Sequence, residues 1–164
     1  MNRSISNFRD ATERALSRAW WVAITLGATL VATSALGAVD DCGEVLEPEI
    51  VAGQQHGGSV AGVAQAIWEY MGFDPDGQPT TANFTTYGLP SAPEVPPITT
   101  AVMHTLTERN SLGSRGIGEN GCNGATAAVH NAVMDALSSR GVEHIDLPLT
   151  PEKVWRAINS ADAD

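Results

Sequence analysis

The chain has 164 residues, of which 43% are hydrophobic and only 5% aromatic, and its 16 glycines and 9 prolines leave room for one modest core between many loops. Residues 1–38 carry a net charge of about +2 and the remainder about −12, which together give the net charge of −10. So acidic a main body excludes nucleic acid as a partner, and acidity alone indicates solubility rather than catalysis.

Residues 1–38 differ in character from everything that follows. The run 19–33 has no charge and is apolar enough for the core of a signal peptide or a short membrane span. Ala35 and Gly37 then provide small residues at positions −3 and −1 of a cleavage point. We therefore predict an apolar N-terminal helix that acts as a signal or anchor, with membrane contact through 19–38, or else non-native upstream sequence.

Short strands and three helices are predicted after this segment, which indicates an α+β fold. Asp74-Pro75-Asp76-Gly77 is a turn signal, and the stretch after it is rich in Thr, Phe and Tyr, which predicts a hairpin strand. Gly141 ends one helix, and Thr150 before Pro151 caps the next. The predicted strands are 39–43, 80–87, 98–107 and 142–145, and the predicted helices are 60–71, 125–138 and one that begins at 151. Residues 159–164 are expected to form a disordered acidic tail.

A glycine-rich loop, 112–121, precedes the helix at 125–138. Its exposed backbone N–H groups could bind an anion, but no Gly-Lys-Ser/Thr follows, and the spacing departs from a dinucleotide fingerprint. Glu119 lies on this loop, where close backbone approach and partial exclusion of water favour a general base. From spacing alone, a glycine turn with a solvated carboxylate remains the alternative.

The cysteines and histidines do not have the spacing of a metal site. Cys42 and Cys122 lie far apart without a CxxC or Cys/His pattern, so we expect two buried free thiols, with a disulfide as the alternative in an exported chain. The four histidines are expected to be solvated or hydrogen-bonded. Trp68 and Trp155 are expected to anchor their helices in the core.

Several ordered motifs between about residues 39 and 158 resemble one protein family. The run Arg115-Gly116-Ile117-Gly118-Glu119 and the tail 141–155 are similar to the C-terminal part of the molybdopterin-binding large subunit of the xanthine dehydrogenase/aldehyde oxidase family, the molybdenum hydroxylases. Residues 39–43, 53–58 and 74–77 match in the same order. The resemblance implies that 39–158 is a fragment of the second molybdopterin-binding domain.

The resemblance also implies roles for individual residues. In the family, the glutamate of the Gly-x-Gly-Glu turn lies beside the molybdenum and acts as the general base, and its position here is Glu119. Gln54 is expected to hydrogen-bond the pterin, whose many polar edges suit an amide and glycine backbone. The cofactor-binding residues implied are Gln54, Gly57, Gly58, Gly116 and Gly118. The expected cofactor is molybdenum-molybdopterin in its cytosine dinucleotide form, bound only in the complete subunit and without a metal ligand from this chain.

The resemblance starts inside a domain, and two explanations stay open. The favoured one is a truncated or frameshifted remnant, and the other is a split subunit that docks onto a separately encoded remainder. The implied partners are that remainder and iron–sulfur and flavin subunits, in the cytoplasm, where such enzymes normally receive their cofactor. We expect hydroxylation of aldehydes or N-heterocycles only in that assembly and none by the chain alone. The alternative function is a small exported or membrane-anchored acidic binding protein, periplasmic if residues 1–38 are a real signal.

Overall fold

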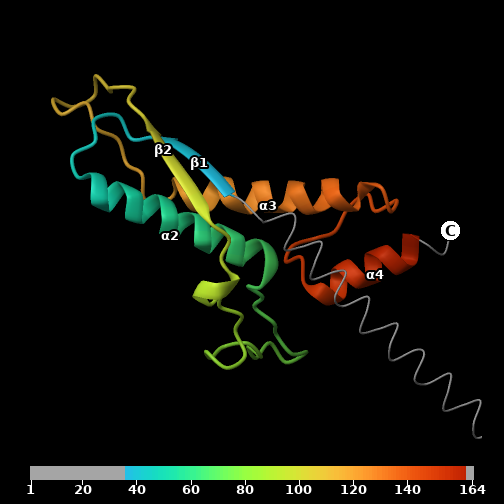
Figure 1. Cartoon of the computed structure of the whole chain (residues 1–164). Helices are drawn as coiled ribbons and strands as arrows, with labels where there is room; N and C mark the ends of the chain where they lie inside the picture. Colours follow the sequence, from blue (N-terminus) through green and yellow to red (C-terminus); the bar gives the residue numbers. More distant parts are fainter. Residues whose placement is uncertain (1–35, 162–164) are drawn as a thin grey trace, which may run out of the picture.

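The computed structural model describes residues 36–161 and has an α+β architecture (Figure 1). Two strands, three α-helices and one short 3-10 helix make up this part of the chain, which confirms the predicted fold class. In chain order they are β1 (Leu36–Asp41), α2 (Pro48–Ile67), η1 (Ala92–Glu94), β2 (Ile98–Met103), α3 (Asn120–Ser138) and α4 (Pro151–Ala161).

The two strands are parallel and pair from Leu36 opposite Ile98 to Asp41 opposite Met103. They lie across α2 and α3 (Figure 1). Exposure alternates along β2 and along β1 up to Asp40, because successive side chains point to opposite faces. The expected boundary between residues 38 and 39 falls inside β1. Cleavage after Gly37 would therefore remove part of the strand.

Helices α2 and α3 pack closely because glycines line their contact. A Cβ atom added to Gly62 would lie 2.6 Å from the Cys122 carbonyl oxygen and 2.7 Å from the Ala125 Cβ atom. A Cβ atom on Gly121 would lie 2.8 Å from both the Gln55 oxygen and the Ser59 nitrogen. These glycines leave no space for a side chain, so the two helix backbones meet directly.

The hydrophobic core lies at the far end of this helix pair and is closed by α4. Its members come from α2, α3, the segment 142–149 and α4, and they share almost complete burial. They are Val63, Ala66, Ile67, Val129, Val133, Leu137, Val142, Ile145, Leu149, Val154 and Ile158. Trp68 packs against this core as expected, whereas Trp155 is half-buried outside it.

Four predicted features agree with the structure. The Thr150 hydroxyl accepts a hydrogen bond from the Lys153 N–H at the start of α4. Gly141, with φ of 74°, follows the end of α3, and the Asp74 carboxylate accepts hydrogen bonds from the Asp76 and Gln78 N–H groups in the predicted turn. The strand expected from residue 98 forms, although it ends at Met103.

Two predicted strands are wrong. Residues 80–87 form turns because Asn83 accepts hydrogen bonds from the Thr85, Thr86 and Tyr87 N–H groups and so replaces a strand partner. A single bridge between Phe73 and Pro79 flanks the preceding turn. Residues 142–145 pack into the core without strand pairing.

The helices also differ from prediction at their ends. α2 begins at Pro48 and α3 at Asn120, both well before the expected starts, and α2 ends at Ile67, before Met71. α4 continues through Ala161, so the first part of the expected disordered tail is helical. The expected apolar helix and the run 19–33 lie outside the described residues. Among the helices of residues 36–161, none has the length and apolar character that crossing a membrane requires.

Candidate functional site

The turn after β1 holds the loop that leads to Glu119. Gly43 has φ of 66°, which favours glycine, and it forms an antiparallel bridge with Ser114. The Arg115 N–H donates to the Cys42 carbonyl oxygen at 2.7 Å, and the Glu44 N–H donates to the Gly113 carbonyl at 3.1 Å. Two motifs that lie about 70 residues apart in the sequence are thereby joined at one end of the molecule.

Asp41 ties a third segment to this turn. Its Oδ1 atom accepts hydrogen bonds from the Gly43 N–H and from the Thr105 N–H, each at 3.0 Å. Hydrogen bonds from the Thr105 hydroxyl and from these two backbone groups lower the pKa of Asp41 to about 2, with a smaller contribution from the Arg115 charge. The ionised carboxylate thus links the end of β1 to the residues after β2.

Glu119 lies at the N-terminus of α3. It is the N-cap residue, and its side chain makes no capping hydrogen bond and is exposed. The positive end of the helix dipole lies beside it, and unsatisfied N–H groups of the first turn point toward the same region. The carboxylate has no polar partner in the described part of the chain.

Gln54 comes from α2 and lies next to the same loop. Its Oε1 atom is 3.7 Å from the position that a Cβ atom on Gly118 would occupy. The side chain is exposed and makes no hydrogen bond within residues 36–161. The structure therefore brings Gln54, Gly118 and Glu119 together at the start of α3.

The three other glycines expected at the site have different surroundings. Positions of added Cβ atoms on Gly57 and Gly116 meet no atom within 4 Å, so both leave open space. A Cβ atom on Gly58 would lie 3.1 Å from the Cys122 nitrogen, which makes Gly58 a packing residue between α2 and α3. The backbone N–H groups of Gly57 and Gly58 are inside α2, where intrahelical hydrogen bonds use them.

Gln55 is a structural residue of this region that the sequence analysis missed. It is 1% exposed, and its Nε2 atom donates to the Asp40 carboxylate at 2.8 Å and to the Ala101 carbonyl oxygen at 2.9 Å. One amide thus links α2 to both strands. A sequence signal would have been its four- and eight-residue spacing from the buried positions Val51, Ser59 and Val63, had the helix start at Pro48 been known.

Both cysteines are free thiols, as expected, but the expected burial holds for Cys42 alone, because Cys122 is half-buried. Among residues 36–161, no group of three or more His, Cys, Asp or Glu side chains could hold a metal ion. His130 and His144 form a tilted ring pair, and their nitrogen atoms contact the Ile145 carbonyl oxygen and the Asp146 carboxylate.

Comparison with known proteins identifies the family. Residues 21–96 match the model of a molybdopterin cofactor-binding domain, a range that begins ahead of residue 39. The chain is 41% identical over 119 residues to the nicotine 6-hydroxylase large subunit of Paenarthrobacter nicotinovorans, which covers 73% of this chain and 15% of that protein. The chain belongs to the xanthine dehydrogenase/aldehyde oxidase family and corresponds to a part of its molybdopterin-binding large subunit.

Further members of this molybdenum hydroxylase family agree in sequence and in structure. The carbon monoxide dehydrogenase large chain of Hydrogenophaga pseudoflava is 36% identical over 121 residues, covering 74% of this chain and 15% of its own length. The quinoline 2-oxidoreductase of Pseudomonas putida 86 superposes with a TM-score of 0.72 at 36% identity, over 75% of this chain and 16% of that one. Carbon monoxide dehydrogenase of Oligotropha carboxidovorans gives a TM-score of 0.73 at 31% identity, with coverages of 77% and 16%. The chain therefore spans about a sixth of these relatives or less.

The described residues fit the cofactor that this family binds. A pterin offers hydrogen-bond donors and acceptors along its edges, and the unpaired Gln54 amide can serve either kind of group. Open space at Gly57 and Gly116 allows a bulky ring system to approach the backbone. Nothing in the comparisons supports the alternative of an exported acidic binding protein.

Proposed function

We propose that this chain supplies part of the molybdopterin pocket and the general base of a molybdenum hydroxylase. The observation that carries the proposal is the meeting of Gln54 and Glu119 at Gly118, both exposed and both without a polar partner among residues 36–161. Two unpaired polar side chains from separate helices at one helix N-terminus are available for a ligand and a reaction rather than for the fold.

Each residue has a defined role in this proposal. When bound, the molybdenum cofactor in its cytosine dinucleotide form supplies the redox chemistry of hydroxylation. Gln54 donates through Nε2 and accepts through Oε1 at the pterin edge. The Glu119 carboxylate accepts one proton per turnover and releases it to solvent. Gly57, Gly116 and Gly118 allow close approach.

The substrate class and partners follow from the relatives. The names of these proteins include a nicotine 6-hydroxylase, a quinoline 2-oxidoreductase and an aldehyde oxidoreductase, so aldehydes or N-heterocycles are the proposed substrates. Several are named as large subunits or as a subunit of a complex. We therefore propose that this chain functions in a complex with three partners: the remainder of a large subunit, an iron–sulfur subunit and a flavin subunit.

A chimera tests the proposal. The 119-residue matching segment of the nicotine 6-hydroxylase large subunit is replaced by the corresponding part of this chain, and the complete complex is assayed for nicotine hydroxylation and molybdenum content. Glu119→Gln should lower kcat by roughly 10²–10⁴-fold with unchanged molybdenum content. Gln54→Ala should lower the molybdopterin content itself.

Glu108→Gln is the matched control, because Glu108 is an exposed carboxylate on the loop between β2 and α3. It should keep both activity and cofactor. Full turnover by the Glu119→Gln chimera would show that Glu119 is not the general base. Unchanged cofactor content in Gln54→Ala would show that Gln54 does not bind the cofactor.

A further inference from the structure

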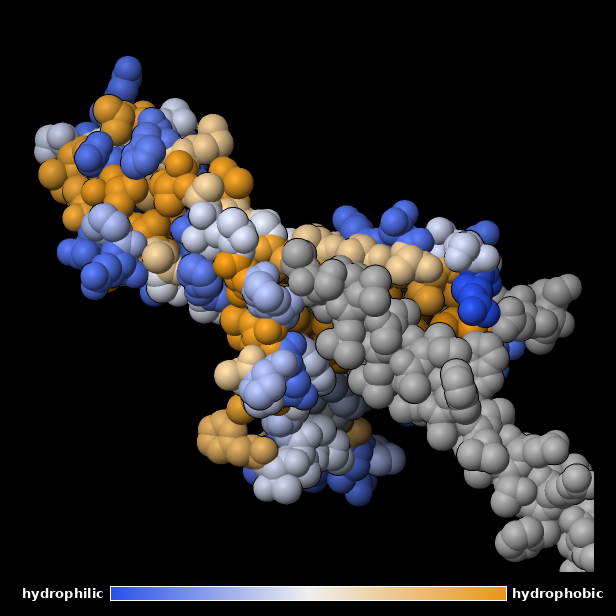
Figure 2. All heavy atoms as spheres, viewed as in Figure 1, coloured by the Kyte–Doolittle hydropathy of each residue, from blue (hydrophilic) through white to orange (hydrophobic). Residues whose placement is uncertain are grey.

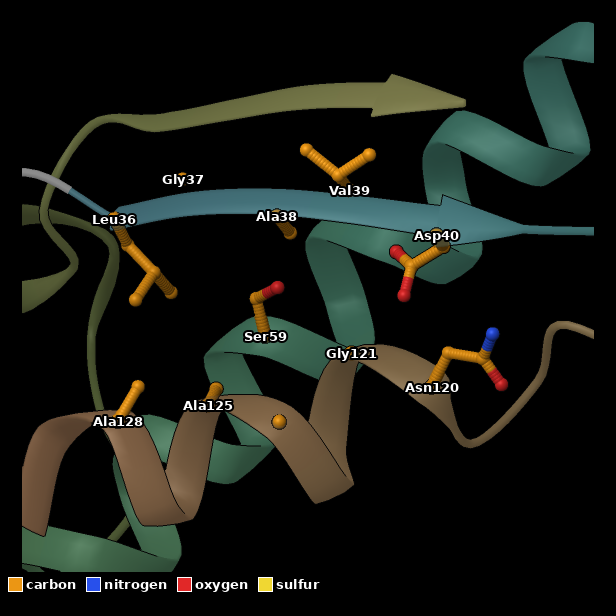
Figure 3. A pocket seen from close by; sticks show the side chains of 11 residues that line it. Leu36, Gly37, Ala38, Val39, Asp40, Ser59, Asn120, Gly121, Ala125 and Ala128 are labelled. Carbon is orange, nitrogen blue, oxygen red and sulfur yellow. The ribbon is translucent and has the colours of Figure 1, made fainter. Parts of the chain in front are cut away.

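A pocket lies beneath β1, and neither Gln54 nor Glu119 is among the residues that line it. It has a volume of about 210 Å³ and is bounded by β1, by Ser59 of α2 and by the first turns of α3. No residue of β2 lines it. The space therefore lies on the side of β1 that faces α3, away from the other strand (Figure 3).

Ser59 is the unusual residue of this pocket. It is 1% exposed, and its Oγ atom is buried without a hydrogen-bond partner in the described structure. Figure 3 shows the hydroxyl directed from α2 toward the space below β1. A buried hydroxyl without a partner destabilises the fold, so its presence here points to a group that completes its hydrogen bonding.

The strand above the pocket is also incomplete. β1 and β2 form a parallel two-stranded sheet, and the other edge of β1 has no strand partner among residues 36–161. Parallel sheets of this kind occur as parts of larger sheets with both faces covered. The outer face is open as well, because Val39 is 65% and Met103 56% exposed.

From these observations we infer that an extended segment from the remainder of the large subunit adds to the free edge of β1 and fills the pocket. The chain spans about 15% of its relatives, so most of such a subunit lies outside it. This inference rests on the proposed function, and it names the surface through which the remainder docks.

The pocket lining defines the chemistry of the docked strand. Its backbone N–H and C=O groups pair with those of β1 that point away from β2. Small apolar side chains of the docked strand face the end of the pocket that Ala125 and Ala128 form. A hydrogen-bonding side chain of the docked strand faces the polar end, where Ser59 lacks a partner and the Asp40 Oδ1 atom accepts no hydrogen bond from the described residues. Because Asp40 is an acid, this side chain is a donor.

Residue-resolved hydrogen exchange tests the docking without reference to activity. It compares the isolated full chain with the apo form of the nicotine 6-hydroxylase chimera. The alternate β1 amides that point away from β2 should exchange at least about tenfold more slowly in the chimera. Equal rates in the two proteins overturn the inference. Protection already present in the isolated chain also overturns it, because the strand edge is then covered by this chain itself.

Variants on α3 locate the effect. Ala128→Trp fills the pocket from its rim and should abolish the extra protection in the chimera, whereas Ala127→Trp, at an exposed neighbouring position outside the pocket, should retain it. Ser59→Ala should reduce the protection by about three- to tenfold, as for one lost hydrogen bond. Protection that survives Ala128→Trp overturns the assignment of the pocket.

These readouts separate the two proposals. A chimera with protected β1 amides but without cofactor or hydroxylase activity refutes the proposed function and retains the docking surface. An active chimera whose free-edge β1 amides exchange as fast as in the isolated chain supports the proposed function and refutes the docking surface.

Discussion

Two adjacent glutamines on α2 point to different surroundings and have different uses. Gln55 is buried, and its amide donates hydrogen bonds to Asp40 of β1 and Ala101 of β2. Gln54 is exposed beside Gly118 and makes no hydrogen bond among the described residues. Because neighbouring helical residues lie about 100° apart, one side chain supports the fold and the other is free for a ligand.

The two glutamines give a matched pair of variants. Gln55→Ala removes two hydrogen bonds, one of them to the Asp40 carboxylate, so the free energy of unfolding should fall by about 2–4 kcal/mol. Gln54→Ala should change it by less than about 0.5 kcal/mol. Urea denaturation of the full chain, followed by circular dichroism, measures both. Equal losses for the two variants would contradict the assigned roles.

The hydrogen bonds that Asp41 accepts from Gly43 and Thr105, near the Glu119 loop, make this part of the fold sensitive to acid. The pKa of Asp41 is lowered from 3.8 to about 2 by the Thr105 and Gly43 hydrogen bonds, so the stability that it contributes is present above pH 3.8 and is lost as the pH falls through about 2. The melting temperature should therefore decline over this window, and Asp41→Asn should show a lower plateau and a shallower decline.

Thermal melts of the full chain between pH 2 and pH 6 check this dependence. Asp135→Asn is the control, because Asp135 is exposed on α3 and its carboxylate makes no hydrogen bond among the described residues. It should leave the acid-induced loss as in the unchanged chain. An Asp41→Asn variant with an undiminished slope would show that other carboxylates govern the acid response.

At the scale of elements, the glycines of α2 explain why its start was mispredicted. Gly53 and Gly57 leave open space, whereas Gly58 and Gly62 are required by the backbone of α3. In the sequence, all four glycines look like loop residues. In the structure, Gly58 and Gly62 form the helix surface that packs against α3. The C-terminal end of α3 and the cap of α4 were predictable because Gly141 and Thr150 act through local geometry.

The remaining errors have the same physical origin. Thr, Phe and Tyr at 80–87 favour a strand, but strand formation needs a partner edge, and Asn83 supplies local hydrogen bonds instead. Gln55 could not be separated from Gln54 without knowing that the helix already begins at Pro48. The meeting of Gln54 with the Glu119 loop was expected from the family motifs rather than from residue spacing.

The α2–α3 contact predicts opposite effects for two similar changes. Gly62→Ala places a methyl group 2.6 Å from the Cys122 carbonyl oxygen, which should destabilise the chain by about 1–3 kcal/mol. Gly53→Ala places it in open space within the same helix and should stabilise the chain by about 0.5–1 kcal/mol. Chemical denaturation of both variants measures the difference. A stabilising Gly62→Ala would show that the helices do not approach this closely in solution.

At the scale of the whole molecule, large apolar side chains remain on the surface. Figure 2 shows apolar residues at the end that carries the turn after β1 and the loop after β2, and the exposed residues there include Leu46, Ile50, Met103, Leu106 and Leu112. Phe84, in the segment that projects below α2, is 90% exposed (Figure 1). Such surfaces are typical of interfaces, which agrees with a chain that spans about 15% of its relatives.

The isolated chain should therefore have no hydroxylase activity, even when supplied with the cofactor. Glu119 is exposed, and the described residues place Gln54 and glycines on one side of it without enclosing a substrate. General-base catalysis needs a reacting group held to within a fraction of an ångström to about 1 Å, and an open surface does not provide this. Purified full chain, incubated with molybdenum cofactor, aldehydes or N-heterocycles and an electron-accepting dye, should reduce no dye above the rate without protein. The active chimera serves as the positive control, and turnover by the chain alone that disappears in Glu119→Gln would show that these 164 residues already form a complete catalytic site.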